Sequence, residues 1–155
     1  IAGGLPMSAV ISTEEIMSEW HAGMHGTTFG GNPVCAAAAL AVLDEYKETN
    51  ILENVHQMGA YLKEKLEALK GKYSCISDIR GIGLMVAIEF SHEDGTPAGD
   101  VFAEVRDECF KNKLLTLACG VYGNGLRFAT PLNVTKKEID EGIEIIDKVL
   151  NKVWK

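Results

Sequence analysis

Apolar and small residues recur at helical spacing in the middle of the sequence, which predicts two long helices in series. The first covers the alanine-rich stretch from Pro33 to about Glu48, because Asn32 is a favoured capping residue and proline is favoured at the first helical position. The second extends from about Asn50 to Gly71, where glycine stops it. Its apolar positions repeat three or four residues apart, at Val55, Gly59, Leu62, Leu66 and Leu69.

Near Ser74 the apolar pattern changes to a period of two. Leu84, Val86, Ile88 and Phe90 alternate with other side chains, and this alternation predicts a strand. The pattern beyond them predicts, in order, a polar loop over 92–99, a helix over 100–112, and strands over 114–119 and 126–129.

Two capping boxes mark further helix starts. Ser12 with Glu15 predicts a short helix over 13–21, and Thr135 with Glu138 begins the last helix. That last helix has an apolar stripe at Ile139, Ile143, Ile146, Leu150 and Val153. The change of period divides the chain, so we expect residues 1–73 to be the C-terminal piece of a larger domain and residues 74–155 to form a small C-terminal α/β domain with an α+β layer.

Composition and charge exclude several classes of partner. The formal net charge is −7 and no cluster of Lys and Arg occurs, so no nucleic-acid partner is expected. The longest apolar run, Val34 to Leu43, is too short to cross a bilayer. We expect a cytoplasmic protein with no membrane partner.

No metal site is predicted. The four cysteines contain no C-x-x-C pair, which argues against zinc and for reduced thiols. His21 and His25 are four residues apart, but Gly23 interrupts the helix that would place them on one face.

The loop from His25 to Pro33 contains the parts of a phosphate site. Thr27 and Thr28 supply hydroxyls, three glycines allow close backbone approach, and the unpaired N–H groups of the following helix carry partial positive charge. The alternative is a tight turn with a helix cap, and the loop alone does not decide between them.

The sequence H-G-T-T-F-G-G-N-P-V-C-A-A-A-A-L-A-V-L is similar to the segment that follows the catalytic lysine in class III, fold-type I, pyridoxal-phosphate-dependent aminotransferases. Three further blocks resemble the family in the family's order: A-G-G-L-P-M-S-A-V over 2–10, D-I-R-G-I-G-L-M over 78–85, and G-L-R-F-A-T-P-L over 125–132. The resemblance covers nearly the whole chain.

This resemblance implies the C-terminal part of a fold-type I transferase, with long helices that lead into a small antiparallel sheet covered by helices on one face. It implies pyridoxal 5'-phosphate as cofactor, a homodimer, and amino acid and keto acid substrates. Thr28 is then the hydroxyl that contacts the cofactor phosphate of the neighbouring subunit, with Thr27 a weaker candidate. Arg127 is the arginine that holds a substrate carboxylate, whereas Arg80 is expected to be structural. The family's catalytic lysine corresponds to a position upstream of Ile1, so this chain is expected to contain no catalytic residue and to be inactive alone.

The substrate is a finer question. Residues 115–124, L-T-L-A-C-G-V-Y-G-N, most resemble the 4-aminobutyrate aminotransferases, which transfer the amino group to 2-oxoglutarate, and Tyr122 there is a candidate specificity residue. Acetylornithine or ornithine aminotransferases are the alternative. Two other possibilities stay open: a non-catalytic dimerisation module, and a glutamate-1-semialdehyde mutase or decarboxylase on the same fold.

Overall fold

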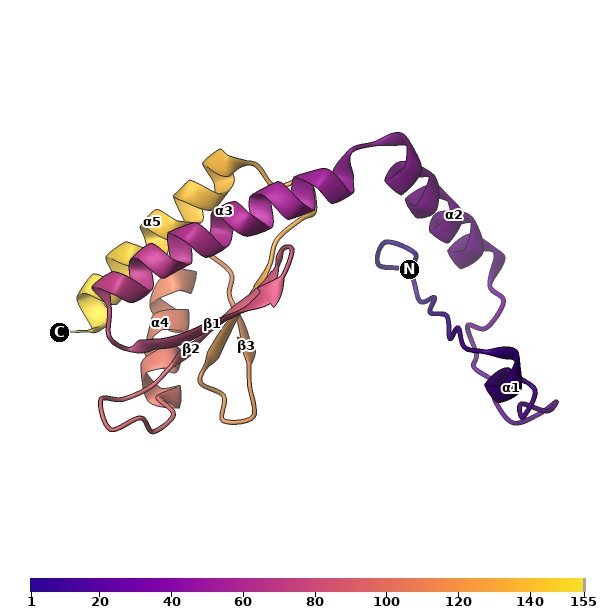
Figure 1. Cartoon of the computed structure of the whole chain (residues 1–155), viewed down its shortest axis with the longest axis horizontal. Coiled ribbons are helices and arrows are strands. Elements are labelled where there is room, and N and C mark those ends of the chain that lie inside the picture. The colour runs from indigo at the N-terminus through magenta and orange to yellow at the C-terminus, as the bar shows by residue number, and fades with distance from the viewer. Residues whose placement is uncertain (155) are drawn as a thin grey trace. The chain divides into compact units, whose positions relative to one another are not determined.

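The computed structural model describes residues 1–154, and the chain forms two compact units that divide between Asn50 and Ile51 (Figure 1). The boundary near residue 73 predicted above concerns domains of the whole protein and stays a prediction. In this structure α3 (Ile51–Lys72) belongs to the second unit because it packs against the sheet there.

The first unit consists of turns and two helices, α1 (Glu14–Met17) and α2 (Pro33–Glu48). The predicted start and end of α2 are confirmed, and Asn32 caps it as expected. The predicted helix over 13–21 is wrong in length and in its cap: α1 has four residues, and Thr13 at its N-cap makes no side-chain hydrogen bond. None of the α1 residues is buried, so no packing stabilises a helix beyond its costly first turn.

The second unit is a four-stranded antiparallel sheet with the order β1-β2-β4-β3 and three helices on one face. In Figure 1, α3 and α5 run side by side along this sheet. This arrangement confirms the predicted fold class. Beyond α3, the elements are β1 (Ile76–Ile82), β2 (Met85–Phe90), α4 (Gly99–Lys111), β3 (Leu117–Cys119), β4 (Gly125–Ala129) and α5 (Lys136–Val153).

The core lies between the sheet and the helices. Alternate residues of β2 point into it, as the period of two predicted: Val86, Ile88 and Phe90 are buried. They meet apolar side chains of α3, α4 and α5 such as Leu66, Val105 and Ile146. Within residues 51–154, no helix covers the opposite face of the sheet, and its side chains are exposed or only partly buried.

Helix α3 touches the β1–β2 turn through backbone. A Cβ atom built on Gly59 would lie 2.3 Å from the carbonyl oxygen of Gly83, far inside van der Waals contact. Gly83 itself has a φ of +53°, in the left-handed region that favours glycine. The two glycines therefore allow the helix and the turn to meet without an intervening side chain.

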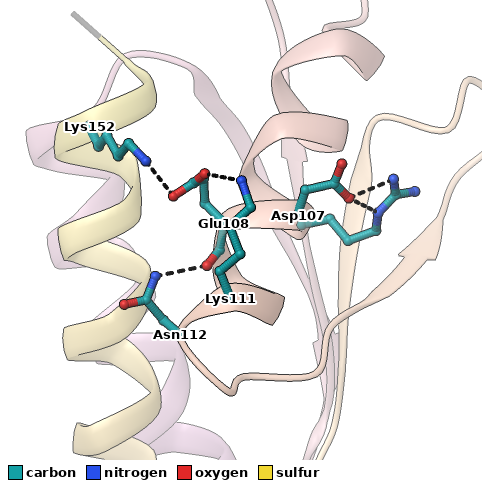
Figure 2. A network of polar contacts seen from close by, with 6 residues as sticks. Asp107, Glu108, Lys111, Asn112 and Lys152 are labelled. Atoms are coloured by element: carbon teal, nitrogen blue, oxygen red, sulfur yellow. Dashed lines mark hydrogen bonds and ion pairs between the residues drawn. The ribbon is translucent and has the colours of Figure 1, made fainter.

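The C-terminal ends of α4 and α5 are joined by a polar network around Glu108 (Figure 2). Its carboxylate accepts hydrogen bonds from Lys152 of α5 at 2.6 Å and from Lys111 at 2.7 Å. The side-chain amide of Asn112 donates to the Glu108 carbonyl oxygen at 2.8 Å. Within residues 1–154, no helix is long and apolar enough to cross a membrane.

Candidate functional site

The loop before α2 is a succession of turns. The backbone N–H of Gly30 donates to the Thr27 carbonyl oxygen at 3.2 Å, and that of Asn32 donates to the Phe29 carbonyl oxygen at 3.1 Å. Gly31 has a φ of +73°. These contacts shape the loop without using either threonine hydroxyl: among the described residues, neither the Thr27 nor the Thr28 hydroxyl makes a hydrogen bond.

The N-terminus of α2 differs from the expectation in one respect that matters for chemistry. The Asn32 side-chain oxygen accepts hydrogen bonds from the backbone N–H groups of Val34 at 2.9 Å and Cys35 at 3.2 Å, while Pro33 has no N–H. The N–H of Ala36 donates to the Asn32 carbonyl oxygen. The prediction that these helix N–H groups are unpaired is therefore wrong, because the Asn32 cap already accepts their hydrogen bonds. Hydrogen-bond donors for a ligand must come from the loop.

A cavity of about 710 Å³ lies beside this loop in the first unit. Thr27 contributes to its wall, whereas Thr28 is exposed and lies outside the lining. The lining consists of Leu5, Pro6, Met7, Ser8, His25, Gly26, Thr27, Phe29, Gly30, Gly31, Asn32 and Cys35. No Asp or Glu side chain is among them, so no carboxylate in this lining repels an anion.

Arg127 lies in the second unit, on the exposed face of β4. It pairs with Ala87 of β2 on one side and Leu117 of β3 on the other, while its neighbour Leu126 points into the core. The predicted orientation of Arg127, opposite to Leu126, is confirmed. A shallow cavity of about 390 Å³ lies beside it, otherwise lined by Val55, Ile82, Leu84, Met85, Phe128, Ala129, Thr130 and Leu132.

The arginines differ in their partners. Arg80 donates to Asp78 at 2.6 Å and to Glu89, and these hydrogen bonds, the Glu89 bond first, raise the pKa of its guanidinium. Arg106 pairs with Asp107 at 2.8 Å. Over residues 1–154, Arg127 has no carboxylate partner within ion-pair distance. Arg127 is thus an exposed strand arginine without an ion pair in this part of the chain, whereas Arg80 is paired. That Arg80 is structural stays a prediction.

Asn124 is a positioning residue that the sequence reasoning did not identify. It is buried, its side-chain amide donates to the Phe90 carbonyl oxygen at 2.8 Å, and its own carbonyl oxygen accepts from the Phe90 N–H at 2.9 Å. These bonds hold the β3–β4 turn against the end of β2, and thereby fix the strand that carries Arg127. Its place next to Gly125 signalled a turn, but not the burial. Tyr122 in the same turn is exposed.

A model of the family described as "Aminotransferase class-III" matches residues 1–150. The chain belongs to the class III aminotransferases. Acetylornithine aminotransferase of Clostridium acetobutylicum is 39% identical over 149 residues, which cover 96% of this chain and 36% of that protein. 4-Aminobutyrate aminotransferase of Escherichia coli is 37% identical over 155 residues, which cover 98% of this chain and 36% of that protein. The chain thus spans 36% of the length of these class III relatives.

The fold of the chain is also similar to that of solved transaminases. An amine transaminase from an uncultivated Pseudomonas species, solved in a pyridoxal-phosphate-bound form, superposes with a TM-score of 0.74 at 30% identity over 86% of this chain and 30% of that chain. The assignment to the aminotransferase fold is therefore confirmed. The relatives act on different amino donors at similar identity, so they do not single out a substrate.

Proposed function

We propose that the whole protein transfers an amino group from an ω-amino acid to 2-oxoglutarate with pyridoxal 5'-phosphate as cofactor, and that 4-aminobutyrate is the donor. The observation that carries this proposal is Arg127, an exposed arginine without an ionic partner in residues 1–154, beside a largely apolar cavity. A planar guanidinium suits bidentate contact with a carboxylate, and the apolar walls suit the methylene chain attached to it.

The loop in the first unit fits the phosphate of the cofactor. Thr28 is proposed as the hydroxyl that donates to it and Thr27 as a weaker second contact, since neither hydroxyl is engaged among the described residues. Neutral donors hold a dianion in place without adding a mobile charge. When bound, the cofactor supplies an electron sink for the bonds around the amine-bearing carbon. The phosphate is proposed to be that of the neighbouring subunit of a homodimer.

There is a second candidate for the amino donor. The acetylornithine aminotransferase named above is 39% identical to this chain and the 4-aminobutyrate enzyme 37%, and this keeps acetylornithine or ornithine as the second choice. A non-catalytic dimerisation module is a third reading. It has no need for a free arginine beside an apolar cavity, so the state of Arg127 argues against it.

The decisive experiment measures amino transfer by the whole protein from 4-aminobutyrate, acetylornithine and ornithine, each with 2-oxoglutarate. We expect Arg127→Gln to raise the KM for 2-oxoglutarate at least about tenfold, because it removes a charge-assisted contact. Arg106→Gln is the matched control, since Arg106 pairs with its own neighbour on α4. Equal KM values in the two variants would contradict the role of Arg127, and a protein that ignores 4-aminobutyrate would exclude the preferred donor.

A further inference from the structure

We propose that Arg80 is a positioning residue for the substrate site. By holding the carboxylate of Glu89, it prevents Glu89 from pairing with Arg127 and so leaves Arg127 free for a substrate carboxylate. The inference rests on the proposed function, because it concerns the same arginine. It gives Arg80 a part in substrate affinity, beyond the structural role expected from the sequence.

The charged residues concerned lie on one face of the sheet. Arg80 of β1 and Arg127 of β4 pair with Ala87 of β2 from its two sides, so the three side chains form one row across the open face. Glu89 lies two residues further along β2, and strand alternation places its side chain on the same face as that of Ala87. Glu89 is therefore a diagonal neighbour of both arginines, at a separation that long side chains can span.

The Glu89 carboxylate extends toward the strand that carries Arg127. Its partner in the β2–β4 ladder is Gly125, which has no side chain to block this direction. A Cβ atom built on Gly120, in the turn after β3, would lie 3.6 Å from Oε1 of Glu89. The carboxylate thus lies on the side of β2 where Arg127 is, although it is bonded to the arginine of the other side.

Two guanidinium groups can therefore compete for this carboxylate, and the structure shows which of them binds it. Arg80 donates to Oε1 of Glu89, and also to Asp78 of its own strand at 2.6 Å. The bond to Asp78 holds the guanidinium in place for the bond to Glu89. Within residues 1–154, no ion pair joins Glu89 to Arg127.

Arg127 can bind a carboxylate in either of two directions. On one side, the next row of the open face lines the cavity beside Arg127 and consists of Ile82, Met85 and Ala129. On the other side is the row that contains Glu89. A guanidinium that turns toward Glu89 turns away from the cavity, so each ion pair excludes the other. Loss of Arg80 should therefore lower the fraction of Arg127 available to substrate, and weaken the apparent affinity in proportion.

The test measures kcat and the KM for 2-oxoglutarate of the whole protein in Arg80→Gln, in Glu89→Gln and in the double variant. Arg80→Gln should raise the KM about fivefold with kcat nearly unchanged, as a competing exposed ion pair at the strong end of its ordinary range would do. Adding Glu89→Gln should return the KM to that of Glu89→Gln alone, because the competing carboxylate is gone.

A second cycle distinguishes this role from a merely structural one. In an Arg127→Gln background, Arg80→Gln should raise the KM no further, because there is no guanidinium left for Glu89 to capture. A general disturbance of the sheet would instead add its effect in that background and lower kcat as well.

Arg106→Gln is the matched control, since it is the same substitution at an arginine that pairs with its own neighbour on α4. Arg80→Lys gives the comparison if Arg80→Gln does not fold. Its single ammonium lacks the planar fork that reaches two carboxylates, so it should raise the KM by less, again relieved by Glu89→Gln. An unchanged KM in both Arg80 variants, or a rise that Glu89→Gln does not relieve, would overturn the role of Arg80 and leave that of Arg127 standing. An unchanged KM in Arg127→Gln would overturn both.

Discussion

Glu108 is a single residue that links two helices, α4 and α5, through an ion pair. Its side chain is 12% exposed and lies between Lys111 on its own helix and Lys152 on α5. Hydrogen bonds from Lys111 and then from Lys152 lower the pKa of the Glu108 carboxyl to about 2, from an ordinary value of 4.5. Because the folded value is depressed, the stability that this carboxylate contributes is fully present above about pH 4.5 and is lost as the pH falls toward 2.

This gives a prediction for acid unfolding. Glu108→Gln should lower the urea midpoint of the chain at pH 6 and make the midpoint less dependent on pH between 5 and 2.5, because the titrating group is gone. Glu141→Gln is the control, since the Glu141 side chain is 62% exposed and 3.8 Å from Lys137. Parallel pH profiles for the wild type and Glu108→Gln would show that Glu108 does not couple protonation to folding.

Residues of the site were predictable to different degrees. The orientation of Arg127 follows from strand alternation between Leu126 and Phe128, which is a local property. The partner of Arg80 was not predictable in the same way, because Glu89 becomes its neighbour only through the register of β1 against β2. The Asn32 cap was predicted from its place before proline, but its consequence depends on which N–H groups the side-chain oxygen reaches.

The helices and strands show where the apolar repeat of the sequence predicts secondary structure correctly and where it does not. The long helices and β2 follow their apolar repeats, whereas β1 was not predicted as a strand. The reason is a shift of register between Ile76 and Asp78, which inserts a residue into the strand. Ile76 and Ile79 therefore both point inward although they are three residues apart, a spacing that imitates a helix. The strand Leu117–Cys119 is shorter than the predicted strand over 114–119 because only these residues pair with β4.

Helix α3 allows a test of the glycine contact. In a helix interior, Gly→Ala ordinarily stabilises by about 1 kcal/mol. Gly59→Ala should instead destabilise by about 1–3 kcal/mol, because the methyl group would overlap the Gly83 carbonyl and force the turn away. Gly71→Ala in the same helix has no atom within 4 Å of its new Cβ and should stabilise. Chemical unfolding of both variants measures the difference, and equal signs would argue against a tight contact.

Over the whole molecule, the two proposed binding functions lie in different compact units: Thr28 in the first and Arg127 in the second. We therefore expect them to affect different constants of the whole protein. Thr28→Val should weaken pyridoxal phosphate binding about tenfold and leave the KM for 2-oxoglutarate nearly unchanged at saturating cofactor, while Arg127→Gln should do the reverse. Thr27→Val, with the same loss of a hydroxyl one residue away, identifies which threonine matters. A double variant whose effects are not additive would indicate that the units share one binding event.

The contact between Gly59 and Gly83 also sets the dimensions of the cavity beside Arg127. Val55 lies one helical turn before Gly59, and Ile82 and Leu84 flank Gly83, so one wall of that cavity is attached directly to the glycine contact. Side-chain walls adjust by changing rotamer, but a wall held by two touching backbones cannot. If the acceptor binds here as proposed, the length of chain that fits between this wall and the guanidinium is limited by Gly59, which does not line the cavity. Selection for a longer or shorter substrate would then act on the distance between helix and hairpin as well as on the side chains that line the cavity.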